Sequence, residues 1–226
     1  MNLAVIPARG GSKRIPHKNI NTFCGKPIIA WSIEAALKSE CFDAVIVSTD
    51  CEDIAEIARE YGAEVPFLRP ANLSGDHTET ISVISHAIDW WAGNFEMPEL
   101  VCCIYATAPF ITSDDICLGK KILIKEDCDY AFTVTSFPFP IQRAFNISTE
   151  SRIKMLYPKF FNTRSQDLEQ AFHDAGQFYW GKAEAWMAKK KLFSNKAAPI
   201  ILPTYRVQDI DTPEDWIRAE KMFMAL

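Results

Sequence analysis

The sequence predicts an α/β protein in which helices cover both faces of a mainly parallel sheet. Short β-branched runs alternate with segments of helical periodicity as far as Thr135, and the first strand runs directly into a glycine-containing loop. Strands that alternate with helices pair in parallel, because each crossover returns the chain in the same direction. The 226 residues are enough for a single large core, so we expect one domain over residues 1–226.

Each element follows from its own pattern. Apolar, β-branched runs predict strands at residues 3–6, 44–48, 64–68, 100–105, 130–135 and 199–202. Apolar side chains three or four residues apart predict helices at residues 27–37, 51–61, 81–91, 114–124, 182–191 and 212–226. Asp50 is expected to cap the second helix and Gly62 to end it. Cys102 and Cys103 are adjacent in a strand, so we expect buried thiols on opposite faces.

The alternation breaks at Phe137-Pro138-Phe139-Pro140, and residues 137–172 form an irregular, aromatic insertion. Two interpretations stay open. Prolines among aromatic residues can form a stiff connection. Alternatively, the insertion is an arm that leaves the sheet and packs on a second subunit.

Composition excludes several classes of protein. The net charge of −5 is unfavourable for a nucleic-acid partner. No apolar run approaches the roughly 18 residues of a membrane span, and the N-terminus begins as a strand rather than a signal peptide. The seven cysteines are odd in number and none are spaced C-x-x-C. We therefore expect a reduced, cytoplasmic protein without structural zinc.

A cationic loop after the first strand is the strongest functional signal. Four cations, Arg9, Lys13, Arg14 and Lys18, fall within ten residues of an otherwise acidic chain. The adjacent glycines 10 and 11 can leave backbone N–H groups free for an anion. Many basic loops are only solvated surface. This one follows a strand of an α/β sheet, where ligands bind, and it predicts a triphosphate site. It matches neither the P-loop nor the dinucleotide fingerprint, which argues against both classes.

An acidic pair near the C-terminus is the second signal. Asp209 and Asp211 are two residues apart in an extended segment, so both can leave it on one side. Thr212, Pro213 and Asp215 form a helix start, and one acid alone could simply support that start. Two acids beside a polyphosphate site fit Mg²⁺, which prefers one or two carboxylates with water and phosphate oxygens.

Together the two motifs resemble the CMP-nonulosonate synthetases, cytidylyltransferases that activate sialic-acid-like sugars. Residues 6–19 look like their nucleotide loop and residues 208–212 like their metal motif. Residues 68–78 are similar to the segment that holds cytosine and ribose, and residues 106–110 lie where sialate enzymes carry Pro-Thr-Ser-Pro-Leu. The likeness covers nearly the whole chain and is closest to the pseudaminate branch, through residues 137–143, 161–167 and 173–180.

The resemblance implies a Rossmann-like three-layer α/β/α nucleotidyltransferase fold, a homodimer made through an inserted arm, dependence on Mg²⁺, and CTP and a nonulosonic acid as substrates. It implies catalytic roles for Arg9, Lys13, Lys18 and Asp211, with Asp209 and Asp211 on the metal. The implied nucleotide-binding residues are Ala8, Arg9, Gly10, Gly11, Ser12, Lys13, Lys18, Asn19, Arg69, Ser74, Asp76, Thr78, Ala106 and Thr107. The implied sugar-binding residues are Tyr105, Gln142, Arg143, Arg164, Gln166, His173, Gln177, Phe178 and Tyr179. Arg164 is implied to hold the carboxylate of the sugar acid, either in its own subunit or in the partner subunit.

Two departures from the family pattern point away from sialate. Tyr105 stands where sialate enzymes usually place glutamine, and Gln142 where they have lysine. Pseudaminate is less hydroxylated than sialate, so its pocket needs apolar walls and amide partners. The aromatic residues of 172–180 could be these walls or ordinary core.

The expected reaction is attack of the anomeric hydroxyl on the α-phosphorus of CTP, with release of pyrophosphate. Cytidylyltransferases for sialate, legionaminate or 3-deoxy-octulosonate stay open as alternatives. So do two more distant classes: a GT-A glycosyltransferase, whose metal motif should close a central strand well before the C-terminal region, and a nucleotide-binding regulator without turnover.

Overall fold

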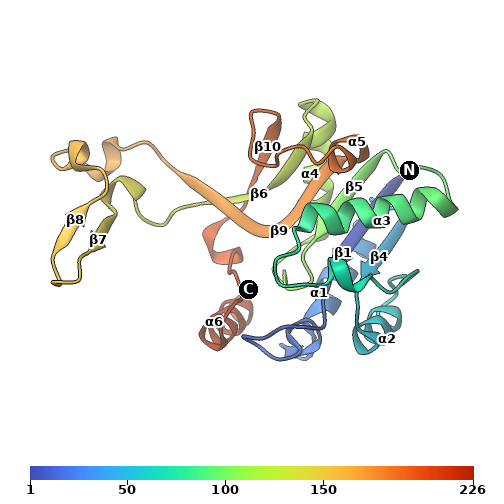
Figure 1. The fold of residues 1–226 in the computed structure, drawn as a ribbon. Coiled ribbons are helices and arrows are strands. Elements are labelled where there is room, and N and C mark those ends of the chain that lie inside the picture. The colour runs from blue at the N-terminus through green and yellow to red at the C-terminus, as the bar shows by residue number, and fades with distance from the viewer.

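A six-stranded sheet runs through the computed structural model, which describes residues 1–226 (Figure 1). Its strand order is β10-β6-β9-β5-β1-β4. The strands are β1 (Asn2–Pro7), β4 (Ala44–Ser48), β5 (Leu100–Ile104), β6 (Tyr130–Ser136), β9 (Phe172–Lys182) and β10 (Ala197–Ile201). Only β9 runs antiparallel to its neighbours, β5 and β6, while the other pairs are parallel. The predicted mainly parallel sheet is confirmed.

Helices cover both faces of this sheet, which gives three layers. The helices are α1 (Ile28–Lys38), α2 (Glu52–Glu60), α3 (Thr80–Asn94), α4 (Ser113–Lys125), α5 (Ala183–Met187) and α6 (Pro213–Phe223). One core cluster joins α1, α2 and α4 to the sheet, and another joins α3 and α5 to its opposite face. None of the helices combines the length and the apolar character that a bilayer crossing requires.

The two cores arise because successive strand residues point to opposite faces. In β1, Ala4 and Ile6 belong to the first cluster and Leu3 and Val5 to the second. Cys102 and Cys103 separate in the same way, and both are fully buried, as predicted. Burying one aliphatic side chain, such as Leu3 or Ile6, contributes roughly 1.5–3 kcal/mol to the free energy of folding.

Three local expectations are wrong. Residues 64–68 form only isolated bridges, at Glu64 and Leu68, in place of a strand. The helix predicted over 182–191 is the shorter α5. Asp50 does not cap α2, whose N-cap is Cys51 without a side-chain cap bond. The Asp50 carboxylate instead accepts a hydrogen bond from the N–H of Gly10 at 2.9 Å. Gly62 ends α2 as expected, with φ of +91°.

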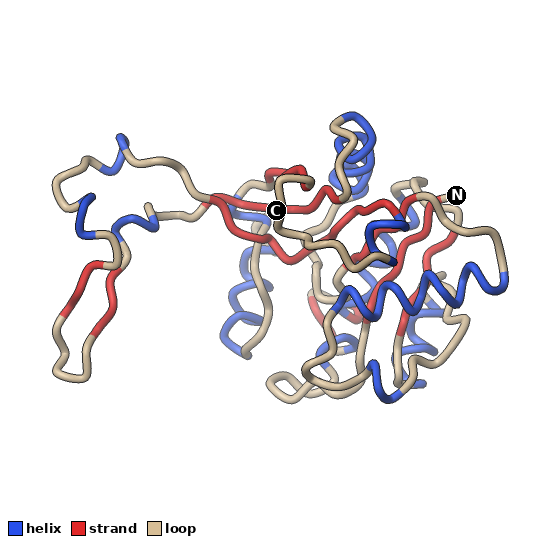
Figure 2. The backbone as a smooth tube through the Cα atoms, turned by 45° about the horizontal axis from the view of Figure 1, so that its top comes forward, coloured by secondary structure: helices blue, strands red, loops and turns tan.

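An arm leaves the sheet after β6 and returns at β9, and it projects away from the rest of the molecule in both views (Figures 1 and 2). Its far part is the hairpin of β7 (Phe145–Ile147) and β8 (Ile153–Met155). Arg143 donates to the carbonyls of Phe161 and Thr163, which holds the arm's own loops together. The arm exposes many large apolar side chains: Phe137, Phe139, Phe145, Ile147, Ile153, Leu156, Tyr157 and Phe161.

A third cluster places the C-terminal segment beside the N-terminal loop. Ile210 and Trp216 are buried against Phe23 and Ile28, at the small hairpin of β2 (Thr22–Phe23) and β3 (Lys26–Pro27) and the start of α1. The predicted start of α6 is confirmed as a capping box of Thr212 and Asp215. These contacts fix residues 208–212 next to the cationic loop.

Candidate functional site

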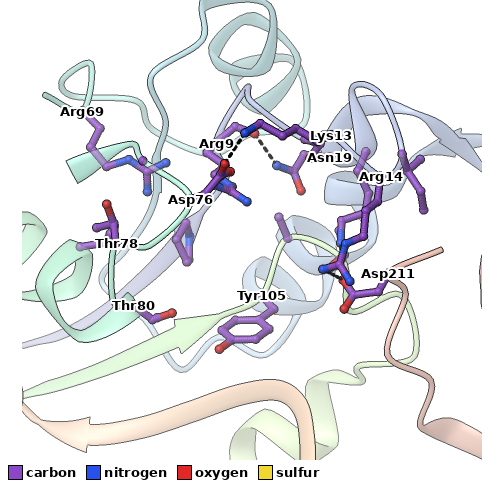
Figure 3. A pocket seen from close by; sticks show the side chains of 18 of the residues that line it. Arg9, Lys13, Arg14, Asn19, Arg69, Asp76, Thr78, Thr80, Tyr105 and Asp211 are labelled. Carbon is purple, nitrogen blue, oxygen red and sulfur yellow. Dashed lines mark hydrogen bonds and ion pairs between the residues drawn. The ribbon is translucent and has the colours of Figure 1, made fainter. Parts of the chain in front are cut away.

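A cavity of about 500 Å³ lies at the carboxyl ends of β1 and β5 (Figure 3). This is the edge at which open α/β sheets bind ligands. Four segments line it: the loop after β1, residues 69–80 with the start of α3, the loop after β5, and the segment before α6. Of the predicted residues it contains Arg9, Ser12, Lys13, Lys18, Asn19, Arg69, Asp76, Thr78, Tyr105, Ala106, Thr107 and Asp211.

The two predicted motifs meet at Asp211. Its carboxylate lies 2.8 Å from Arg14 and 3.4 Å from the Lys18 ammonium. Lys18 also donates to the carbonyl of Ile210 at 2.7 Å. The cationic loop and the acidic segment, far apart in the chain, therefore form one wall of the cavity.

Asp76 pairs with the other two cations of the loop. It lies 2.6 Å from Arg9 and 2.5 Å from Lys13 (Figure 3). These hydrogen bonds, with Lys13 first, lower the pKa of the Asp76 carboxyl. The amide of Asn19 donates to the carbonyl of Arg9 at 2.9 Å and so fixes the shape of the loop.

Arg69 is a buried cation at the inner end of the cavity. Its side chain is only 4% exposed, and its nearest acid is Asp50 at 3.8 Å. The Nε–H of Arg69 has no hydrogen-bond partner in the protein. Burial lowers the pKa of this guanidinium. A buried donor without a partner is costly, so Arg69 is well suited to a ligand that accepts hydrogen bonds here.

The glycines of the loop were expected to leave backbone N–H groups free for an anion, and for Gly10 this is wrong. The N–H of Gly10 is used by Asp50, so it is not free for a phosphate. A Cβ at Gly10 would lie 2.9 Å from the Cβ of Cys51, so glycine is needed for the loop to approach α2 closely. The cavity lining omits Ala8, Gly10, Gly11 and Ser74, and the Ala8 side chain packs in the core.

Tyr105 forms an aromatic wall of the cavity, backed by Tyr179, with ring centroids 5.3 Å apart. The Tyr179 hydroxyl donates to the Asp174 carboxylate at 2.6 Å, and the N–H of Gly176 donates to the same group. Burial raises the pKa of both tyrosines, which keeps their hydroxyls protonated at neutral pH. This buried network holds the Tyr105 ring in place.

The other predicted sugar-binding residues do not reach this cavity within one chain. Gln142, Arg143, Arg164 and Gln166 lie on the arm, where Arg164 pairs with Asp167. His173 lies at the base of the arm against Phe137. Gln177 is buried and donates to the carbonyl of Arg206. Phe178 is fully buried between the sheet and α4, so it packs the core and offers no surface to a ligand.

Asp209 and Asp211 are the residues that could hold a metal ion. No group of three or more acidic, histidine or cysteine side chains is arranged so that it could hold a metal ion. Burial, and then the charge of Asp211, raises the pKa of Asp209. Asp211 lines the cavity, whereas Asp209, two residues before it, is not among the lining residues. Two neighbouring carboxylates that repel each other fit Mg²⁺, which completes its shell with water and phosphate oxygens.

Sequence reasoning assigned no site role to Thr80, Asp50 and Asp174, and it missed the partner of Arg14. Arg14 was visible among the loop cations, but its pairing with Asp211 depends on the fold. Thr80 lines the cavity from the start of α3, Asp50 lies behind Arg69, and Asp174 holds Tyr179. No local pattern gave these three residues a role in the site.

A cationic cavity with Asp211 in its lining, at the carboxyl edge of a three-layer α/β fold, is typical of enzymes that bind nucleotides and act on phosphate esters. Comparison with known proteins makes this specific. The family model for cytidylyltransferases matches residues 3–224. The chain belongs to the cytidylyltransferase family, and it is a nucleotidyltransferase enzyme.

Individual relatives agree. The chain is 44% identical to the pseudaminic acid cytidylyltransferase of Campylobacter jejuni subsp. jejuni serotype O:2, over 95% of this chain and 92% of that protein. It is 33% identical to the CMP-N,N'-diacetyllegionaminic acid synthase of Legionella pneumophila, over 97% of this chain and 95% of that protein. The fold matches a CMP:2-keto-3-deoxy-manno-octonic acid synthetase complexed with CTP, with a TM-score of 0.73, 16% identity and coverage of 99% and 98% of the two chains.

Proposed function

We propose that this enzyme transfers CMP from CTP to a nonulosonic acid, and that the acid is pseudaminate. The observation that carries the proposal is the cavity lined by Arg9, Lys13, Arg14 and Lys18, in which Arg14 and Lys18 contact Asp211. The 44% identity to a pseudaminic acid cytidylyltransferase supports the sugar assignment. The expected setting is the cytoplasm, in keeping with seven free thiols.

In the proposed reaction the anomeric hydroxyl of the sugar attacks the α-phosphorus in line with the departing pyrophosphate. No covalent nucleophile is required, because such transfers depend on alignment and charge neutralisation. Arg9, Lys13 and Lys18 hold the triphosphate and neutralise the leaving group. Arg69 donates to the cytosine or ribose at the inner end of the cavity, where its Nε–H is without a protein partner.

Asp209 and Asp211 are the proposed ligands of Mg²⁺. When bound, the ion supplies positive charge to the phosphate oxygens. The chain's own contribution is to hold Asp211 in the cavity wall, with Asp209 two residues before it, through the burial of Ile210 and the capping box of α6.

The sugar is proposed to lie against Tyr105, with arm residues completing its site. The apolar face of Tyr105, backed by Tyr179, suits a deoxy sugar better than a heavily hydroxylated one. Arg164 lies on the arm and outside the cavity of its own chain. We therefore propose that it contacts the carboxylate of the sugar bound in the cavity of the partner subunit.

Product analysis tests both levels of the proposal. The protein is mixed with CTP, Mg²⁺ and, separately, pseudaminate, sialate, legionaminate and 3-deoxy-octulosonate. We expect pyrophosphate release and a CMP-linked product by mass, with kcat/KM highest for pseudaminate by at least about 10-fold. Comparable kcat/KM for sialate would contradict the sugar assignment. A protein that binds CTP but turns over none of the four sugars would contradict the enzymatic proposal itself.

The apolar arm is proposed to make a homodimer. Ile147 and Ile153 are opposite each other in the β7–β8 hairpin and are 70% and 71% exposed. Replacing both with aspartate should convert a dimer into a monomer in sedimentation velocity, because the charges would remain desolvated at the interface. The control is Asn146→Asp with Lys154→Gln, the adjacent polar pair of the same hairpin. A native protein that sediments as a monomer would refute the arm's role.

A further inference from the structure

The Asp76 carboxylate forms ion pairs with two cations of the loop, Arg9 and Lys13. One oxygen lies 2.6 Å from Arg9 and the other 2.5 Å from Lys13, so each oxygen serves one cation. The family resemblance implied that Asp76 contacts the nucleotide. A carboxylate among phosphate groups would repel them, so the observed pairs need another explanation.

The segment that carries Asp76 is otherwise held only by its own hydrogen bonds. Ser74 donates to the carbonyls of Pro70 and Ala71, and the N–H of Thr78 donates to the carbonyl of Gly75. The two pairs of Asp76 are the hydrogen bonds that connect residues 71–78 to the cationic loop across the cavity. The segment is exposed around Gly75, so it can move as a unit when these pairs open.

A triphosphate needs the same donors. Guanidinium and ammonium groups bind phosphate oxygens through the N–H groups that they offer to a carboxylate. The remaining cations of the cavity have other acids: Arg14 and Lys18 share Asp211, and Arg69 lies nearest to Asp50. Five cations therefore face three carboxylates, and a polyanion that binds here competes with these carboxylates for the same N–H donors.

We propose that Asp76 is an internal competitor of the triphosphate: it holds Arg9 and Lys13 until the phosphates displace it, and residues 71–78 are released with it. This inference rests on the proposed binding of CTP. It makes Asp76 a positioning residue that lowers nucleotide affinity and keeps the two cations arranged for phosphate. A ribose contact would have the opposite effect on affinity.

The test is the Asp76→Asn variant, which keeps the size of the side chain and removes its charge. Affinity is measured by calorimetric titration with CTP, CMP and inorganic triphosphate, without added metal. We expect binding of CTP and of inorganic triphosphate to tighten by roughly 2- to 10-fold, because exposed ion pairs are individually weak. Binding of CMP, which lacks the β- and γ-phosphates, should change by less than about 2-fold.

Glu79→Gln is the matched control, since Glu79 is an exposed acid at the start of α3 without an ion pair. It should leave the affinity for triphosphate within about 2-fold of the native protein. Weaker binding of all three ligands by Asp76→Asn would overturn the inference in favour of a ribose contact. If Glu79→Gln tightened triphosphate binding as much as Asp76→Asn, the effect would come only from the change in net charge, and the inference would also be overturned. Native protein that binds inorganic triphosphate but not CTP would refute the proposed function and leave the competition by Asp76 in place.

Discussion

Replacing Asp211 with alanine is expected to abolish turnover in a protein that remains folded. Asp211 is the one acid that lines the cavity beside Arg14 and Lys18, and it is a proposed metal ligand. Losing one charged contact to the developing transition state typically lowers kcat by about 100- to 1,000-fold. The side chain is 35% exposed and outside the core, so the fold does not depend on it.

Binding measurements separate this role from a general loss of structure. The variant should bind CTP without metal at least as tightly as the native protein, because Arg14 and Lys18 lose their carboxylate partner. Its affinity for Mn²⁺ in the presence of CTP should fall. Glu214→Gln, an exposed acid in the first turn of α6, is the control and should retain activity. A kcat near the native value for Asp211→Ala would exclude the metal assignment.

Replacing Arg69 with methionine is expected to have the second largest effect, on binding rather than on the chemical step. The guanidinium is almost fully buried, and its unpartnered Nε–H is available to the ligand. A hydrogen bond to a charged group contributes about 1.5–3 kcal/mol, so the Kd for CTP should rise by roughly 10- to 150-fold. The methionine side chain retains much of the apolar stem of arginine.

Titration with two ligands shows which part of the nucleotide Arg69 serves. If it contacts the base or ribose, CTP binding should weaken while binding of inorganic triphosphate changes little. Equal losses for both ligands would place Arg69 on the phosphates instead, and unchanged CTP binding would remove it from the site. Arg59→Met, the same change at an exposed position of α2, should leave both affinities unaltered.

Local pattern predicted the elements well where it was unambiguous. The run at 44–48 is the strand β4, and the fully buried β5 lies within 100–105, because β-branched apolar runs can bury both faces of a parallel strand. The pattern failed where tertiary contacts took over. Residues 64–68 look like a strand, but they pair with β4 and the residue after it at isolated bridges only. Asp50 is of a residue type that often caps helices, yet its carboxylate accepts a hydrogen bond from the N–H of Gly10 on another loop.

The aromatic stretch of 172–180 shows the limit for the site. Alternation along β9 was visible in the sequence, but not which face meets the cavity. Phe178 and Trp180 turned out to pack under α4, whereas Tyr179 supports Tyr105. The faces of a strand are equivalent until its neighbours in the sheet are known.

By itself, the sequence determined the alternation of strands and helices, the cationic loop and the acidic pair, because these depend on residues close together in the chain. Only the tertiary structure decided which charges meet. Asp76 lies 67 residues from Arg9, and Lys18 reaches the carbonyl of Ile210 across 192 residues. Such pairs are set by the order of strands in the sheet and by the burial of Ile210 and Trp216, and ion pairs at this separation leave no periodic signal in the chain.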